Sequence, residues 1–155
     1  MVLNDVLKLA ITIGISELAG RIGAFSRSSE WYQAVDKPVV NPPNGVFGPV
    51  WILLYALMGV SAFLIWKQGM GQKKVKIALG VFGIQLFLNA IWSIIFFGFN
   101  NPGRALVDIV LLWVAIVFTM VVFYKISKSA TYLLIPYILW VSFATYLNFA
   151  IWLLN

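Results

Sequence analysis

The sequence predicts an all-α integral membrane bundle of five transmembrane helices, with a long ordered loop between the first and second helices. Its 155 residues are 62% hydrophobic and 10% charged, whereas a soluble domain usually has about a quarter of its residues charged. Residues 38–66, 77–103 and 129–155 contain no charged side chain, and about 20 apolar residues are enough to cross a bilayer core. The whole chain, 1–155, is therefore predicted to form one membrane domain.

The first helix is predicted over about residues 3–25, within a long apolar run. Glu17 and Arg21 lie one helical turn apart in its second half, on one face. We interpret them as an ion pair that reduces the cost of two charges near a membrane edge.

Residues 26–45 have a different composition and are predicted to form a lid. Three prolines break regular structure within this segment. At about 20 residues it is the longest connection in the chain, and loops of that length are usually functional or disordered. Trp31, Tyr32, Val39 and Val40 need a surface to pack on, which favours an ordered lid.

Four further apolar segments predict helices over about residues 46–66, 75–99, 104–124 and 129–154. Gly69 and Gly71 mark a polar hinge before the second of these four, and residues 100–103 form a tight turn before the third. Pro136 is expected to kink the last helix near its second turn. An odd number of spans places the two termini on opposite sides of the membrane.

Basic residues divide unequally between the two sides of the predicted bundle. Arg21, Arg27, Lys37 and Arg104 lie on the lid side, and the amino-terminal side carries seven lysines: Lys8, Lys67, Lys73, Lys74, Lys76, Lys125 and Lys128. The positive-inside rule then favours a cytoplasmic amino terminus and an exterior lid. The net charge of +6 does not indicate a nucleic-acid partner, because the lysines cluster at predicted membrane edges, where they orient helices.

The composition excludes several kinds of chemistry. The chain has no cysteine and no histidine, and its five acidic residues are scattered. Thiol catalysis, a histidine-based catalytic triad and a metal site are therefore not expected, and no cofactor is required.

Polar and aromatic side chains mark inward faces on the predicted helices. Gln85, Asn89, Trp92, Ser93 and Phe96 share one helical face, and amides in hydrocarbon need partners, so this face looks inward. On the second predicted helix, Trp51 and Tyr55 lie one turn apart, and on the fifth, one face carries Trp140, Ala144 and Asn148. Aromatic walls with a few amides and a lid suit a flat, largely apolar ligand, while interhelical hydrogen bonding with aromatic packing is the alternative.

The roles of Asp108 and of the glycines Gly80 and Gly83 each have more than one interpretation. Asp108 lies one turn after Arg104, so it is a ligand contact, a charge neutralised by that arginine, or a carboxylate that stabilises a helix start. Gly80 and Gly83 permit close backbone approach, either within the bundle or between two copies of the chain.

Several sequence blocks together resemble the tryptophan-rich sensory protein and translocator protein family, also known as the peripheral benzodiazepine receptor family. The blocks follow one another in family order from residue 31 onward. They are Trp31–Pro38, Asn41–Pro43, Gly48–Trp51, Leu88–Trp92 with Phe96–Gly98, Ala105–Asp108, Pro136–Trp140 and Phe143–Asn148. The chain resembles the bacterial-type members, which implies a bacterial cell envelope membrane.

The resemblance implies a five-helix bundle, usually dimeric, with a pocket beneath the first connecting loop. Implied ligands are protoporphyrin IX and related tetrapyrroles, and synthetic isoquinoline and benzodiazepine-type compounds. Carried over by position, the ligand-binding residues are Tyr32, Trp51, Asn89, Trp92, Trp140, Ala144 and Leu147. Trp51 and Trp140 match tryptophans implicated in light-dependent porphyrin breakdown, and Ala144 matches an alanine whose replacement by threonine alters ligand binding.

High-affinity cholesterol binding is not expected. Animal members of the family follow the Leu-Asn pair with a tyrosine and an arginine. Here Leu147 and Asn148 are followed by Phe149, and neither a tyrosine nor an arginine follows. The proposed sterol motif is therefore incomplete at this position.

The predicted function is that of a membrane receptor or sensor for porphyrin-type ligands in a pocket beneath the lid. One alternative is an enzyme that degrades porphyrin with light and oxygen, with Trp51 and Trp140 as the catalytic residues. Another is a transporter of tetrapyrroles or other lipophiles, against which stands the lack of an internal repeat.

Overall fold

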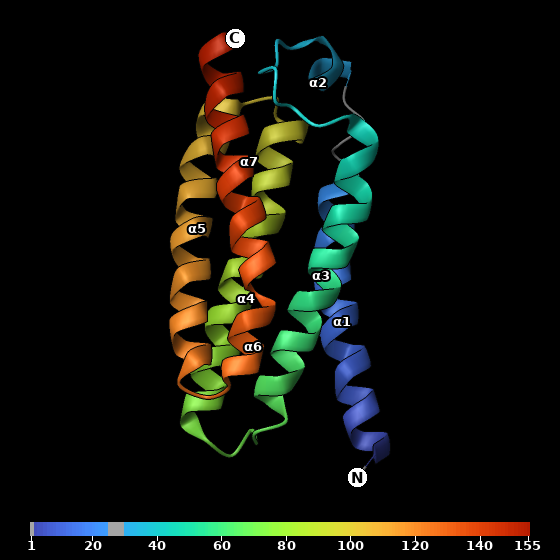
Figure 1. Ribbon diagram of the computed structural model, residues 1–155, viewed down its shortest axis with the longest axis vertical. Coiled ribbons are helices and arrows are strands. Elements are labelled where there is room, and N and C mark those ends of the chain that lie inside the picture. Colours follow the sequence, from blue (N-terminus) through green and yellow to red (C-terminus); the bar gives the residue numbers. More distant parts are fainter. Residues whose placement is uncertain (1, 25–29) are drawn as a thin grey trace.

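The computed structural model describes residues 2–24 and 30–155, and these are mostly helical, with no β-strand among them. The elements are α1 (Val2–Ala24), α2 (Glu30–Ala34), α3 (Asn44–Trp66), α4 (Lys73–Ser93), the π-helix η1 (Ile94–Gly98), α5 (Pro102–Tyr124), α6 (Lys128–Leu133) and α7 (Ile135–Leu154). The long helices run side by side along one axis (Figure 1). The short helix α2 lies at the end of the bundle that also holds the last turn of α7, and the amino terminus lies at the opposite end (Figure 1).

Four helical segments of the described chain are long and apolar enough to cross a membrane. They are α3, α4 with η1, α5, and α6 with α7. α1 is as long as α3, at 23 residues. However, it contains Asp5, Lys8, Glu17 and Arg21, so every 18-residue stretch of α1 carries more charged residues than the best stretch of each of these four segments. The all-α membrane fold is confirmed. Five spans are predicted, and four helical segments of the described residues meet the requirements for a span.

The connection between α1 and α3 differs from the continuous loop predicted over residues 26–45. Phe25 and residues 26–29 lie outside the described residues. The described part begins with α2 and continues without helix from residue 35 to residue 43. Tyr32 is buried, but Val39 and Val40 are exposed, so the expectation that these two valines pack on a surface is wrong.

The predicted helix over 75–99 is present, but its last turn is a π-helix, η1. The predicted helix over 129–154 is interrupted at Leu134, between α6 and α7. Pro136 lies in the first turn of α7, where no N–H is needed, so the new helix starts at this proline. A kink is expected near Pro136, and the structure has instead a break in the helix two residues before it, at Leu134.

Local sequence explains how the chain turns between η1 and α5. Asn100 has a positive φ of 52°, a conformation that asparagine tolerates better than most residues. The Asn101 side chain then caps α5 by accepting a hydrogen bond from the Arg104 N–H at 2.9 Å, and Pro102 occupies the first turn, where no N–H is needed.

α1 approaches its neighbours closely because small residues lie at the contacts. A Cβ atom at Gly59 of α3 would lie 2.5 Å from the Ile13 Cα of α1, and one at Gly23 would lie 2.7 Å from the Ser93 Oγ. Backbone approaches of this kind are typical of helix contacts in membranes. By contrast, a Cβ at Gly14 would meet nothing within 4 Å.

We expect Gly59→Ala to destabilise the protein by about 1–3 kcal/mol, the usual cost of overpacking. The added methyl group would meet backbone, which cannot rotate away. Gly14→Ala in the facing helix is the matched control and should be neutral or slightly stabilising, because alanine favours helix. Unfolding in mixed micelles measures both, and equal stabilities for the two variants would contradict the close approach of α1 and α3.

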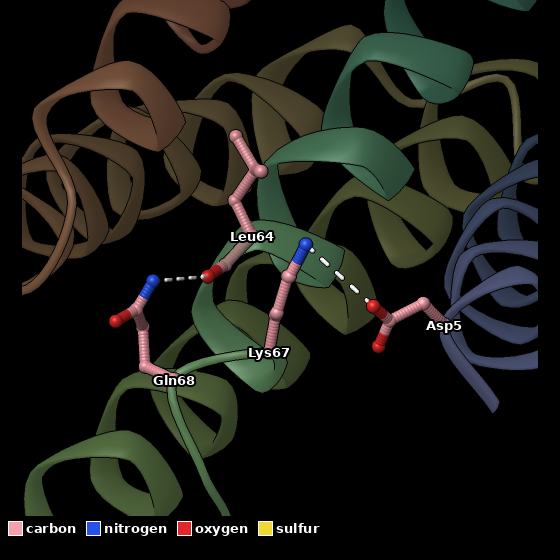
Figure 2. A network of polar contacts seen from close by, with 4 residues as sticks. All are labelled: Asp5, Leu64, Lys67 and Gln68. Atoms are coloured by element: carbon pink, nitrogen blue, oxygen red, sulfur yellow. Dashed lines mark hydrogen bonds and ion pairs between the residues drawn. The ribbon is translucent and has the colours of Figure 1, made fainter. Parts of the chain in front are cut away.

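An ion pair joins the ends of α1 and α3 at the amino-terminal end of the bundle. The Lys67 Nζ lies 3.6 Å from an Asp5 carboxylate oxygen, and the Gln68 amide bonds to the Leu64 carbonyl beside it (Figure 2). Both charged side chains are partly exposed, so this pair contributes little to stability. Within the described residues, Glu17 and Arg21 form no comparable ion pair.

Candidate functional site

The lid, defined here as residues 30–43, is held against the bundle by aromatic contacts. The Trp31 ring meets Phe96 edge-on at a centroid distance of 5.6 Å, and Tyr32 meets Phe97 at 5.2 Å. Phe96 and Phe97 belong to the π-helix η1, and such irregular turns often occur at functional sites. The lid therefore rests on the irregular end of the third predicted span.

Tyr32 is fixed within the lid as well as against the bundle. Its hydroxyl donates a hydrogen bond to the Asn41 side-chain oxygen at 3.3 Å, and the Lys37 ammonium lies 4.7 Å from the centre of its ring, a cation–π contact. Burial raises the pKa of the Tyr32 hydroxyl above its usual value, although the bond with Asn41 works in the other direction. The hydroxyl therefore stays protonated and able to donate.

A cavity of about 120 Å³ lies beneath the lid, bounded by α2, α3, the α4–η1 end and α7. Six of the seven residues predicted to bind ligand line it: Tyr32, Trp51, Trp92, Trp140, Ala144 and Leu147. The structure thus brings these six side chains together from four elements. Asn89 does not line the cavity.

Two tryptophans form one wall of the cavity. The Trp51 and Trp140 ring centres are 6.4 Å apart, with the rings nearly perpendicular. Trp51 also stacks on Tyr55 at 5.5 Å, and Phe47 meets Trp140 edge-on at 6.0 Å. Edge-on and offset contacts at these distances are favourable, so the wall is held rigidly.

The Trp140 indole nitrogen is a buried donor without an acceptor among the described residues. Buried polar groups nearly always have a hydrogen-bond partner, and leaving one unsatisfied costs about 1–3 kcal/mol. Because Trp140 lines the cavity, an acceptor atom of a ligand there could satisfy it. Gln33, Asn44 and Asn148 are further polar residues of the cavity lining.

Asn89 belongs instead to a buried hydrogen-bond network between α3, α4 and α7. Its side-chain oxygen accepts a hydrogen bond from the Tyr55 hydroxyl, and its nitrogen donates to the Tyr137 hydroxyl at 2.8 Å. Tyr137 in turn donates to the Gln85 side-chain oxygen at 2.8 Å. Asn89 thus holds three helices together. Its contact with the cavity is indirect, because it bonds to Tyr55 and Trp51 of the cavity wall stacks on Tyr55.

A second chain of polar contacts fixes the opposite side of the cavity. The Trp92 indole N–H donates to the Asn148 side-chain oxygen at 2.9 Å, and the Asn148 nitrogen donates to the Pro102 carbonyl at 2.7 Å. This connects α4, α7 and the first turn of α5. Trp92 also stacks on Phe96 at 5.3 Å, so its indole ring cannot turn without breaking both contacts.

Asp108 is buried on the inward face of α5 but does not line this cavity. One of its carboxylate oxygens has no hydrogen-bond partner among the described residues, and Arg104 forms no ion pair with it there. The interpretation that Arg104 neutralises Asp108 through a direct contact is therefore wrong.

Further cavity residues were not among the predicted site residues. They are Gln33, Asn44, Phe47, Phe96, Phe97, Asn148 and Ile151. Phe96 and Asn148 share inward faces with Trp92 and Trp140, so helical periodicity could have identified them. Phe97 follows Phe96 in η1 and lies outside the helical face that Asn89, Trp92 and Phe96 share, so spacing did not indicate it.

The sequence matches the TspO/MBR family over residues 8–153. "Tryptophan-rich protein TspO" of Chlorobaculum tepidum is 44% identical over 155 residues, which cover 98% of this chain and 98% of that protein. The protein of the same name from Archaeoglobus fulgidus is 44% identical, covering 97% and 99%. The "Translocator protein" of Homo sapiens is 43% identical over 123 residues, covering 79% and 73%. With four described helices able to cross a bilayer, the chain is an integral membrane protein and belongs to the TspO/MBR family.

Proposed function

We propose that this chain is a membrane receptor that binds protoporphyrin IX, or a related flat lipophilic molecule, in the cavity beneath the lid. The observation that carries the proposal is the aromatic cavity with the unsatisfied Trp140 indole N–H in its wall. A mostly apolar pocket with few polar groups is typical of small-molecule sites. The indole N–H would donate a hydrogen bond to a carboxylate or carbonyl oxygen of the ligand.

The size of the cavity adds a requirement. Pockets for drug-sized ligands usually measure about 300–1,000 Å³, and this cavity measures about 120 Å³. A porphyrin would therefore fit only after the lid or the surrounding rings move outward. The lid contacts are mainly aromatic edges, which can separate without leaving polar groups buried.

Filling the cavity tests this proposal. Ala144 is buried and lines the cavity, so we expect Ala144→Phe to weaken binding of protoporphyrin IX by at least about tenfold, or ~1.4 kcal/mol. The matched control is Leu139→Phe on the same helix, because Leu139 is 64% exposed. Titration in the dark, followed by tryptophan fluorescence, measures both. Equal affinities in two folded variants would refute binding in this cavity.

A second candidate function is degradation of the bound porphyrin by light and oxygen. The contact between Trp51 and Trp140, 6.4 Å apart at the cavity wall, favours it, because both oxidisable indoles would lie against one ligand. Loss of porphyrin absorbance under illumination distinguishes this function from binding alone.

We also propose that α1 is the fifth span and that the amino terminus faces the cytoplasm of a bacterial cell. Two observations support this: α1 contacts α3 closely at Gly59, and the two termini lie at opposite ends of the bundle (Figure 1). A homodimer is proposed as well. Gly80 and Gly83 would accept a Cβ without contact in the described chain, so their face of α4 is open to a second copy.

A further inference from the structure

The net charge of the chain lies at one end of the bundle. This end holds the start of α1, the connection between α3 and α4, and the connection between α5 and α6 (Figure 1). We call its seven basic residues the lysine end: Lys8, Lys67, Lys73, Lys74, Lys76, Lys125 and Lys128. Of the five acidic residues of the chain, only Asp5 lies at this end, so its formal charge is +6, and the remaining four basic and four acidic residues of the sequence cancel.

Asp5 offsets little of this positive charge. Its carboxylate pairs with the Lys67 ammonium at 3.6 Å, and within the described residues the other six lysines form no ion pair. Lys8 is half-buried, and the remaining lysines of the set are exposed. The lysine end therefore presents an excess of positive charge that the described part of the chain does not neutralise.

Aromatic rings place two of these lysines at the depth of the bilayer interface. The Lys8 Nζ lies 5.9 Å from the centre of the Trp66 ring, and the Lys128 Nζ lies 5.5 Å from the centre of the Tyr124 ring. Trp66 and Tyr124 are the last residues of α3 and α5, and such rings at the ends of spans typically lie among the lipid headgroups. The ammonium groups beside them are therefore at the level of the lipid phosphates.

Three lysines are concentrated where α4 begins. Lys73, Lys74 and Lys76 are exposed, the first turn of α4 has no acidic residue, and the side chain of Gln72 makes no capping hydrogen bond there. A helix start carries partial positive charge, so lysines are unfavourable at this position and an anion is favourable. By contrast, α1 has Asp5 in its first turn. An external anion would thus relieve a repulsion that the residues around the start of α4 leave in place.

We propose that the lysine end binds the headgroups of anionic phospholipids such as phosphatidylglycerol. The charge of this end is complementary to a headgroup with a net negative charge, and its lysines lie at the depth where such headgroups lie. Phosphatidylcholine has the same phosphate, but its own ammonium group cancels the charge, so it is the natural comparison. The proposal depends neither on porphyrin binding nor on the orientation of the chain in the membrane.

Two double variants remove equal charge from opposite ends of the bundle. Lys73→Gln with Lys74→Gln reduces the charge of the lysine end, and Arg21→Gln with Arg104→Gln is the matched control at the other end. All four side chains are exposed, where substitution does not disturb the core. Each lysine near an anionic bilayer surface strengthens binding by roughly fivefold, so the loss of two lysines is measurable.

The first readout is competition between lipids. The full-length protein in a neutral detergent receives equal amounts of dioleoyl phosphatidylglycerol and dioleoyl phosphatidylcholine, and native mass spectrometry counts the lipids that remain bound. The wild type should prefer phosphatidylglycerol, and the double lysine variant should bind it about tenfold more weakly, with phosphatidylcholine unchanged. The double arginine variant should match the wild type. A wild type without this preference overturns the proposal and points to an acidic protein as the partner, and an equal loss in both variants overturns it as well.

The second readout is thermal unfolding with each lipid added separately. Phosphatidylglycerol should raise the Tm of the wild type and of the double arginine variant, and raise it less in the double lysine variant. About 0.5 M sodium chloride should remove most of the increase, because salt screens exposed charges. Equal stabilisation by phosphatidylcholine would show that acyl chains rather than headgroups are recognised, and this result overturns the proposal.

Discussion

Asn89→Leu is expected to destabilise the folded bundle by about 1–4 kcal/mol. The leucine removes the hydrogen bonds that Asn89 makes with Tyr55 and Tyr137, and the buried Tyr137 hydroxyl loses a donor. Bonds of this kind are worth less in a membrane than full burial suggests, because the unfolded chain in the bilayer also finds partners. Unfolding in mixed micelles measures the loss.

Gln68→Leu is the matched control, because it also replaces an amide by leucine but at an exposed position. Its stability should stay within about 0.5 kcal/mol of the wild type. Asn89→Leu should weaken protoporphyrin IX binding only modestly, through the stacking of Trp51 on Tyr55. A large loss of affinity without loss of stability would instead make Asn89 a direct ligand contact.

The double variant Trp51→Phe with Trp140→Phe is expected to weaken binding of protoporphyrin IX by roughly ten- to a hundredfold. Both rings line the cavity, and phenylalanine covers less of the ligand than an indole does. It also lacks the N–H that Trp140 offers to an acceptor. Equilibrium titration in the dark, monitored through porphyrin absorbance, gives the affinity.

The control for the double variant is Trp113→Phe. Trp113 is 39% exposed and its indole N–H already donates to Ser142 at 2.9 Å, so it lies outside the cavity wall. Its replacement should leave the affinity within about twofold of the wild type. If both proteins bind like the wild type, the two tryptophans of the wall do not contact the ligand.

Illumination of the same proteins then addresses the degradative function. If Trp51 and Trp140 carry the reaction, porphyrin absorbance should fall in the wild type and in Trp113→Phe, but not in the double variant when it is saturated with porphyrin. Loss of absorbance at equal rates in all three proteins would mean that the porphyrin reacts by its own photochemistry.

The sequence predicted the long helices well because lipid imposes a simple requirement. A span needs about 20 apolar residues with its backbone bonded internally, and the charge-free stretches meet that requirement without reference to tertiary contacts. α1 is the instructive case, since its apolar run predicts a helix although Asp5, Lys8, Glu17 and Arg21 leave it no charge-free stretch of span length. Its place in the bundle follows instead from glycine contacts such as Gly59 with Ile13, which no local pattern encodes.

The candidate site was predicted in part for a similar reason. Helical spacing places Trp140 and Ala144 on one face and Trp92 on another, and the resemblance to the family added Tyr32 and Leu147. Spacing could not separate Asn89, which meets tyrosines, from residues that face the cavity. The hydrogen bonds between the Asn155 side chain and the Asp36 backbone were equally hidden, because the two residues lie 119 positions apart.

Binding of porphyrin in the cavity is tested most directly by an experimental structure of the protein with protoporphyrin IX, prepared in the dark. We expect porphyrin density beneath the lid, against Trp51 and Trp140, with an acceptor oxygen within hydrogen-bond distance of the Trp140 indole nitrogen. The cavity should be wider than in the empty protein, and the lid displaced from η1. Porphyrin bound only on the lipid-facing surface, with the cavity unchanged, would contradict binding beneath the lid.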